Sequence, residues 1–330
     1  MRRLSPALAA AAALPLVLAT AGSAVAAPTK TTTMFKDLTF VQWGGTAGYD
    51  LYTSNADGSA LSMLAKGATN SVATTTNSPA TEWTPVSDPA SGFIAFQSSR
   101  GGDPDVWVQN MNTGTLNRVT SSTDHEAPGG WYHDASGAPR VVYCGSATCN
   151  QLFSIRPDGN DRRAVTEPLT SLHRFTVSPA GTVAVMVDSG DGTDRIYTFT
   201  IDPNGTVPTS VWTPVTAPPA GLTDVTPTFA PNGDLVFARN GNGVGRLMRI
   251  AAGATESAAT PAQLMLQQGV SLANPSFSPG TGRLAYSVNT TTSATSGYKI
   301  AVATVGANNV VTGSTVLKTT TDASQPAWRS

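Results

Sequence analysis

One pattern recurs along this chain at nearly constant spacing. An aromatic or large apolar residue, a short step of Ser, Thr or Ala, and usually a proline precede a glycine turn and a run of Val, Leu or Ile. The six copies are Trp83-Thr84-Pro85, Trp131-Tyr132-His133, Val177-Ser178-Pro179, Phe229-Ala230-Pro231, Phe277-Ser278-Pro279 and Trp328-Arg329-Ser330. Their first residues are 48, 46, 52, 48 and 51 residues apart. Over 330 residues, such a repeat predicts an array of similar units rather than one large core.

The stretch Thr81–Thr120 is the best-kept copy of the repeat. Two strand-like runs, Phe93–Ser98 and Val106–Asn110, flank the turn-forming residues Arg100-Gly101-Gly102-Asp103-Pro104. One further strand is expected before this hairpin and one after it. The repeat unit is therefore a four-stranded meander of about 40 residues, which is the size of one propeller blade.

The two ends of the chain complement each other. The N-terminal part has three strand-like runs, Leu38–Val41, Tyr49–Tyr52 and Leu61–Leu64, with no copy of the pattern before them. The C-terminal run Gln325–Trp328 is such a copy with nothing after it. Pairing of the two ends closes a ring and removes exposed sheet edges, whereas a linear solenoid needs capping repeats. We therefore predict an all-β fold, a six-bladed β-propeller of four-stranded blades whose first blade is closed by the C-terminal strand.

The first residues predict a secretory signal peptide over residues 1–27. A basic start, Met1-Arg2-Arg3, is followed by an apolar run, Ala7–Thr20, and by the small-residue cleavage signal Ala24-Val25-Ala26. The arginine pair leaves twin-arginine export open beside general secretion. We expect a secreted or extracytoplasmic protein with no membrane span after cleavage, in which residues 28–330 form the propeller.

Charged residues make up 12% of the chain and the formal net charge is −1, without a basic cluster. A nucleic-acid partner is not expected, because phosphate binding depends on clustered Lys and Arg.

The two cysteines, Cys144 and Cys149, stand at the end of one expected strand and the start of the next. In an oxidising compartment this pair favours a disulfide that closes a hairpin loop. Free thiols or a metal site are the alternatives, and the metal site lacks a second pair of ligands.

The residues Pro79–Pro85, Phe93–Arg100 and Asp105–Val108 resemble the repeat of the TolB-like propellers, P-x-W-S-P-D-G, L-A-F-x-S-x-R and D-I-Y. Later copies around Pro227 and Pro275 are similar, so that the resemblance covers essentially the whole chain after residue 27. It implies the propeller fold. TolB has an α/β domain ahead of its propeller, and here we expect the propeller alone. Similar propellers precede a hydrolase domain in prolyl oligopeptidase-type enzymes, but no G-x-S-x-G motif occurs in this chain.

Candidate binding residues lie in loops that such a fold gathers on one face. The loops from second to third strands, and the connections between blades, surround the mouth of the central channel. Arg100 and Asp103 belong to the first kind of loop, and Asp124, His125 and Glu126 to the second. His133 with Asp134 is expected at a turn on the opposite face. Each of these polar groups also fits a solvated loop without a function.

A carboxylate cluster, Asp188, Asp191 and Asp194, is a candidate calcium site, because hard cations take oxygen ligands from glycine-containing loops. Its spacing differs from that of the twelve-residue calcium loop, and Asp-Gly at a hairpin tip has a backbone reason of its own. No other cofactor is expected. Among the tryptophans, Trp83, Trp131 and Trp328 are expected to pack between blades, whereas Trp43 and Trp212 are candidates for ligand contact.

We therefore predict a non-catalytic, monomeric propeller that binds a protein, peptide or cell-envelope glycan through its channel-mouth loops. The alternative is an enzyme acting on polysaccharide, a lyase or glycoside hydrolase with carboxylates or a metal at the channel mouth. Several carboxylates that converge on the axis would favour the enzyme. A wall of hydroxyl and apolar groups would favour binding.

Overall fold

The structure, a computed structural model, describes residues 36–43, 49–64, 82–145, 149–168, 172–205, 212–257, 259–268, 270–289, 291, 297–306, 311–319 and 321–329. All of them belong to one compact unit, Thr33–Ser330. The predicted signal peptide, residues 1–27, lies outside the described residues. The described part is all-β: it contains strands only, and no helix in it is long and apolar enough to cross a membrane.

Four of the sheets have four strands each. The first consists of β24 (Ala323–Trp328), β1 (Leu38–Trp43), β2 (Tyr49–Ser54) and β3 (Ser62–Met63), in that order. The second consists of β4 (Glu82–Asp88), β5 (Phe93–Ser98), β6 (Asp105–Asn110) and β7 (Leu116–Arg118). The third consists of β16 (Thr223–Phe229), β17 (Leu235–Gly241), β18 (Val244–Ile250) and β19 (Ala262–Gln268). The fourth consists of β20 (Ser271–Phe277), β21 (Arg283–Asn289), β22 (Tyr298–Val305) and β23 (Val311–Val316).

The remaining sheet has eight strands in the order β11-β10-β9-β8-β12-β13-β14-β15. One half consists of β8 (Glu126–His133), β9 (Pro139–Gly145), β10 (Leu152–Ile155) and β11 (Arg163–Ala164). The other half consists of β12 (Leu172–Val177), β13 (Thr182–Asp188), β14 (Asp194–Thr200) and β15 (Thr213–Pro214). Each half is an antiparallel meander, and the two halves meet at one parallel pair, Gly130 with Val177.

This sheet differs from the separate four-stranded sheets that the sequence predicts, and glycine is the reason. A Cβ added to Gly130 would lie 2.8 Å from the backbone nitrogen of Val177, and one added to Gly129 would lie 2.3 Å from the Phe175 ring. Real Cβ atoms do not come so close to backbone atoms. Two residues without a Cβ therefore let β12 approach β8 closely enough to join the two halves.

The C-terminal strand closes the first sheet, as predicted. β24 pairs antiparallel with β1, with Trp328 opposite Leu38. Two backbone hydrogen bonds extend the seam beyond the pairing: Trp43 N donates to Asp322 O at 2.8 Å, and Arg329 N donates to Asp37 O at 2.9 Å. The two ends of the described chain are thus held in one sheet.

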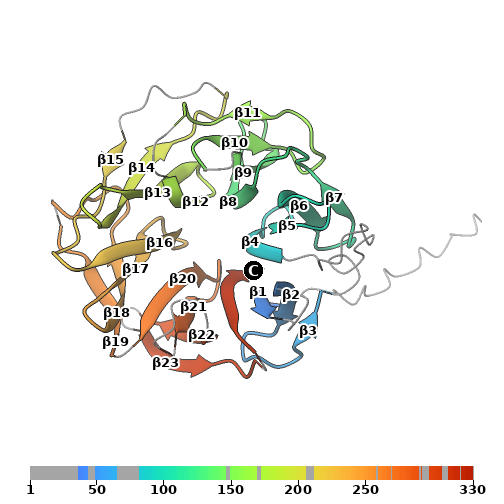
Figure 1. Cartoon of the computed structure of the whole chain (residues 1–330). Coiled ribbons are helices and arrows are strands. Elements are labelled where there is room, and N and C mark those ends of the chain that lie inside the picture. The colour runs from blue at the N-terminus through green and yellow to red at the C-terminus, as the bar shows by residue number, and fades with distance from the viewer. Residues whose placement is uncertain are drawn as a thin grey trace, which may run out of the picture. The chain divides into compact units, whose positions relative to one another are not determined.

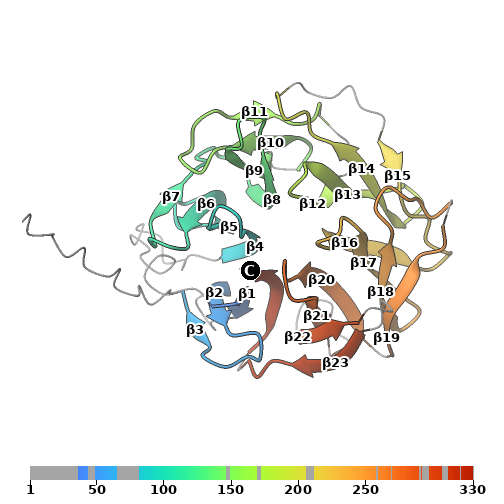
Figure 2. The same cartoon turned by 180° about the vertical axis from the view of Figure 1, so that it is seen from behind.

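The sheets have a propeller-like arrangement around a common axis, with β4, β8, β12, β16, β20 and β24 innermost (Figures 1 and 2). Apolar side chains fill the spaces between neighbouring sheets. Val106 and Val108 of β6, for example, share a buried cluster with Trp131 and Phe153 of the next sheet. A single meander cannot bury its apolar face alone, so packing against the neighbouring sheets stabilises the fold.

Trp131 and Trp328 occupy corresponding places in this packing. Each lies close to the end of an innermost strand and donates its indole Nε1–H to a carbonyl oxygen of the preceding sheet. Trp131 donates to Val86 O at 2.9 Å, and Trp328 donates to Ser276 O at 2.8 Å. The prediction that these two residues pack between repeat units is confirmed.

Trp83 does not share that place, and the structure corrects the sequence alignment of the repeats. It is the second residue of β4, and Ser87 has the position in β4 that Trp328 has in β24. Thr84-Pro85 corresponds to Thr226-Pro227, since both pairs lie at the bulge inside an innermost strand. Ala230-Pro231 follows the innermost strand and is a different position.

Cys144 and Cys149 form a disulfide, with Cα atoms 5.2 Å apart. The bond joins the end of β9 to the residues before β10 and therefore closes the hairpin loop, as predicted.

Candidate binding site

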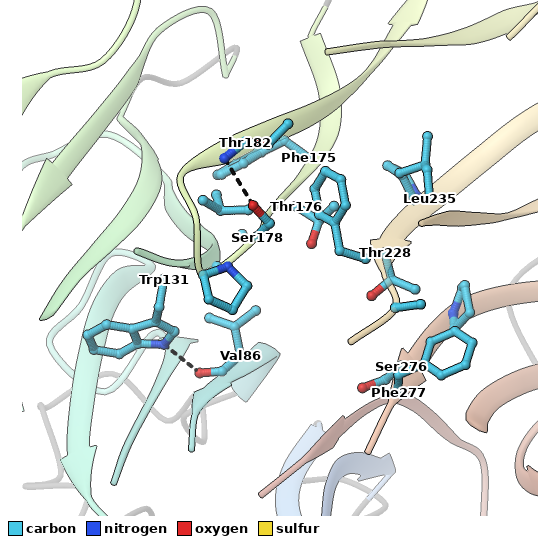
Figure 3. Close-up of a pocket in the computed structure, with 18 of the residues that line it drawn as sticks. Val86, Trp131, Phe175, Thr176, Ser178, Thr182, Thr228, Leu235, Ser276 and Phe277 are labelled. Carbon is cyan, nitrogen blue, oxygen red and sulfur yellow. Dashed lines mark hydrogen bonds between the residues drawn. The ribbon is translucent and has the colours of Figure 1, made fainter. Parts of the chain in front are cut away.

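A central cavity of about 1110 Å³ lies where the innermost strands meet (Figure 3). Its wall takes residues from β4, β8, β12, β16, β20 and β24. Hydroxyl side chains come from Thr84, Thr176, Thr226, Thr228 and Ser276. Prolines come from Pro85, Pro128, Pro227, Pro275 and Pro326, and aromatic rings from Trp131, Phe175, Phe229, Phe277 and Trp328. The volume is slightly above the range of about 300–1,000 Å³ for ligand pockets.

Four innermost strands share an unusual backbone at the same position. The residue before the proline has a positive φ: 47° at Thr84, 50° at Thr226, 48° at Asn274 and 55° at Gln325. At this place the register with the second strand also shifts by a β-bulge. A residue other than glycine in this region costs about 1–3 kcal/mol, so the surrounding structure must hold it there.

Side chains at this position join one sheet to the next. Gln325 Oε1 accepts a hydrogen bond from the Thr84 backbone N–H at 2.7 Å, and Thr226 Oγ1 accepts one from the Asn274 N–H at 2.9 Å. Ser287 Oγ accepts from the Gln325 N–H at 3.1 Å. These hydrogen bonds link β16 to β20, β21 to β24, and β24 to β4. They offset the backbone cost and fix the wall of the central cavity.

Only a few titratable side chains of the described residues line the cavity. They are Asp88, His133, His173 and Arg174. Asp88 is the last residue of β4; its Oδ1 accepts from the Ala90 N–H in the following turn at 3.2 Å, and its Oδ2 lies 3.4 Å from His133 Nε2. None of the 21 Asp and Glu residues of the sequence falls outside the described part, and Asp88 is the single carboxylate in this wall.

Arg100, the first predicted binding residue, is part of the interior of its sheet. It is 8% exposed, its Nη2 lies 2.9 Å from Glu82 Oε1, and its guanidinium lies over the rings of Phe96 and Trp107. Asp103, at the tip of the same loop, is exposed. Neither side chain lines the cavity. A role of Asp103 in binding stays a prediction.

The three residues of the connection Asp124-His125-Glu126 differ in burial. His125 is exposed and Asp124 is half-buried, whereas Glu126 is buried and accepts hydrogen bonds from Ser122 and Thr120. None of the three residues lines the cavity. They lie outside its wall, so a binding role for them also stays a prediction.

Two buried carboxyls near these residues have raised pKa values. Burial raises the pKa of Glu82 to about 7, although Arg100 acts in the opposite direction. Burial also raises the pKa of Asp105 to about 7, and the neighbouring Glu126 adds to this against Arg118, whose Nη2 lies 2.6 Å away. Sequence patterns single out neither Glu82 nor Asp105, because their protonation depends on burial and on partners from other strands.

The unfolding free energy is therefore expected to fall as the pH rises from about 5 to 8. A carboxyl with a pKa near 4.5 when unfolded and about 7 when folded stabilises the folded state below pH 4.5 and loses this contribution as the pH rises through 7. For Glu82, the shift of the pKa corresponds to about 3 kcal/mol of unfolding free energy. Urea unfolding at about pH 5 and at about pH 8 measures how far this free energy falls. Glu82→Gln should reduce the fall, and the exposed control Glu167→Gln should keep it; an equal fall in all three proteins would contradict the raised pKa.

The three predicted calcium ligands each have a local partner. Asp188 accepts from the Gly190 N–H at 2.8 Å, Asp191 lies 2.9 Å from Arg195 Nη2, and Asp194 lies 3.1 Å from His173 Nδ1. No group of three or more His, Cys, Asp or Glu side chains placed to hold a metal ion occurs in the described ranges. The contacts of Asp188 and Asp191 lie within the hairpin of β13 and β14, and that of Asp194 reaches β12; calcium binding stays a prediction.

The cavity wall contains two polar residues outside the predicted binding loops, His173 and Arg174. They belong to an innermost strand, β12, whereas the predicted binding residues belong to loops. A signal was present: His-Arg interrupts an otherwise apolar strand pattern, Leu172–Val177, which points to side chains that face an enclosed but wet space.

No protein-family model and no curated protein matches this chain. Solved structures do match it. TolB from Acinetobacter baumannii superposes with a TM-score of 0.63 at 16% identity, over 88% of this chain and 66% of that chain. A chain of a nidogen/laminin complex gives 0.60 at 13%, over 88% and 97%, and a TolB homologue from Agrobacterium tumefaciens gives 0.58 at 11%, over 88% and 91%. The fold is that of a TolB-like propeller. At these identities the likeness concerns the fold alone.

Proposed function

We propose that this protein is a secreted or extracytoplasmic six-bladed propeller that binds an extended peptide segment of a partner protein in its central cavity, without catalysing a reaction. The observation that carries the proposal is the composition of the cavity wall. Hydroxyl groups, prolines and aromatic rings form it, and Asp88 is its single carboxylate among the residues that the structure describes. Canonical glycoside hydrolysis uses a pair of carboxylates, so this wall favours binding.

The six-bladed count follows from treating each half of the eight-stranded sheet as one blade. Each half is a four-stranded antiparallel meander, and each contributes one innermost strand, β8 or β12, to the wall. The close approach at Gly130 then joins two neighbouring blades without changing their number.

A peptide suits this wall because the wall offers hydrogen-bonding groups for a peptide backbone and apolar surface for peptide side chains. Hydroxyl groups such as those of Thr176, Thr228 and Ser276 can donate to and accept from a peptide backbone, and Phe175 and Phe277 offer apolar surface for side chains. One of the similar structures is a complex of two proteins, nidogen and laminin, which supports protein binding as a use of this fold. The disulfide supports an oxidising compartment.

Filling the cavity should abolish peptide binding. Octapeptides selected on the immobilised protein from a random display library are expected to bind Thr228→Trp or Thr176→Trp at least about 10-fold more weakly than wild type, a loss of about 1.4 kcal/mol or more. Both residues are half-buried on the cavity wall (Figure 3). The control is Thr312→Trp, which makes the same change at an exposed site on β23.

Circular dichroism and thermal unfolding would show that the variants fold. Failure to select any peptide, or equal binding of the selected peptides by the cavity-filled variants and wild type, would contradict a peptide site in the cavity.

A further inference from the structure

Arg174 is a cation in the cavity wall that has no partner among the described residues. It is the third residue of β12 and therefore lies near the end of the cavity at which the connections between sheets enter. Its side chain is open to the cavity, although the surrounding strands enclose it, and it makes no hydrogen bond or ion pair with any residue in the described ranges. The guanidinium thus has its N–H donors available for a ligand.

Other innermost strands use the same position differently. Arg174 stands three residues before Val177, as Asn274, Thr226 and Gln325 stand three residues before the corresponding residues of their strands. The Thr226 and Gln325 side chains accept hydrogen bonds from the next sheet, and the Asn274 side chain donates to Ser287 of its own sheet. In β12 the bulge falls at His173, and Arg174 is opposite Met186 of β13 and lines the cavity as a cation.

The carboxylate of the wall and the carboxylate beside the preceding residue, His173, do not form an ion pair with Arg174. Asp194 lies 3.1 Å from His173 Nδ1, and Asp88, the last residue of β4, lies close to His133. Burial among the surrounding strands lowers the pKa of Arg174, because it removes part of the water that stabilises the charge. The guanidinium nevertheless stays protonated at neutral pH. An uncompensated charge in a partly desolvated place is stabilised by an anion from outside.

We propose that Arg174 recognises a carboxylate of the bound peptide. This rests on the proposed function, because it assigns the polar contact that orients a peptide in the same cavity. The planar fork of a guanidinium matches the two oxygens of a carboxylate, and one cation matches one negative charge rather than a polyanion. The chemistry is the same for a C-terminal carboxylate and for an Asp or Glu side chain, so the experiment must separate the two sources.

The first arm tests the carboxylate alone. N-acetylglycinate, N-acetylglycinamide and inorganic phosphate are titrated into the ¹⁵N-labelled protein while the Arg174 Nε–Hε resonance is followed by NMR. The resonance is expected to shift with N-acetylglycinate and not with the amide, and its assignment follows from its loss in Arg174→Gln. No shift with N-acetylglycinate, or a shift with phosphate only, would overturn the proposal.

The second arm uses the selected octapeptides. Each is synthesised with a free C-terminus, with an amidated C-terminus, and with each Asp or Glu changed to Asn or Gln. One of these changes is expected to weaken binding to wild type by about 10- to 100-fold, the range that charge-assisted hydrogen bonds give. Loss on amidation identifies the C-terminus, and loss on a side-chain change identifies that residue.

Protein variants complete the second arm. Arg174→Gln should bind the parent peptide as weakly as wild type binds the neutralised one, and Arg174→Lys should restore part of the affinity. Arg283→Gln, an exposed site outside the cavity wall, should bind like wild type. If Thr228→Trp abolishes binding but Arg174→Gln does not, the peptide site stands and the carboxylate assignment is wrong. If no octapeptide binds wild type, the proposed function fails, and the first arm still decides whether Arg174 binds a carboxylate.

Discussion

Replacing Trp328 by alanine is expected to lower the free energy of unfolding by about 3–5 kcal/mol, the usual cost of removing a buried tryptophan. The side chain is 4% exposed and shares a buried cluster with Leu38 of its own sheet and Ala285 of the neighbouring one. Its Nε1–H also donates to Ser276 O at 2.8 Å. Because Trp328 belongs to the strand that pairs the two chain ends, its loss weakens both the seam and the contact between sheets.

Urea unfolding followed by circular dichroism measures this loss. Trp328→Phe is the matched control, since it keeps an aromatic ring but lacks the indole N–H; it should cost less than Trp328→Ala. A Trp328→Ala protein within about 1 kcal/mol of wild type would show that the closing strand contributes little to stability.

Gly130→Val should destabilise the protein by about 1–3 kcal/mol or more, or prevent folding. A Cβ at this position would meet the Val177 backbone nitrogen at 2.8 Å and its carbonyl oxygen at 3.1 Å. Backbone atoms cannot move aside as the end of a flexible side chain can, so β8 and β12 would have to separate. The pair between Gly130 and Val177 is the single strand pairing that links the two halves of the eight-stranded sheet in the described part of the chain.

Gly280→Ala provides the control for this prediction. Gly280 has an ordinary φ, and a Cβ added there would have no atom of the described residues within 4 Å, so the change should stay within about 0.5 kcal/mol of wild type. Thermal and urea unfolding of both variants gives the comparison. Equal stability of Gly130→Val and wild type would mean that the two halves of the sheet do not need this close contact.

The sequence predicted the second and third strands of each meander well, because their apolar and β-branched runs are buried. Phe93–Phe96 and Val106–Val108, for example, fall inside β5 and β6. The bounds of the outermost strands were harder to predict. A strand was expected after the hairpin without defined bounds, and β7 covers Leu116–Arg118. Exposed edge strands carry a weak burial pattern, so their bounds depend on pairing with the neighbouring strand rather than on the sequence.

The candidate site could be predicted only in part. The cavity on the axis followed from the repeat, but the loop residues chosen for binding do not line it, and Arg100 is used to pair with Glu82. Whether an Arg has a carboxylate partner depends on which side chains lie beside it in the fold. Arg100, after β5, pairs with Glu82, whereas Arg174, inside β12, has no ion pair among the described residues.

The most direct test of peptide binding in the central cavity is the dissociation constant of one selected octapeptide, measured by calorimetry for wild type, Thr228→Trp and Thr312→Trp at the same pH. The cavity site predicts that Thr228→Trp binds at least about 10-fold more weakly while Thr312→Trp binds like wild type. Equal dissociation constants for wild type and Thr228→Trp would contradict it.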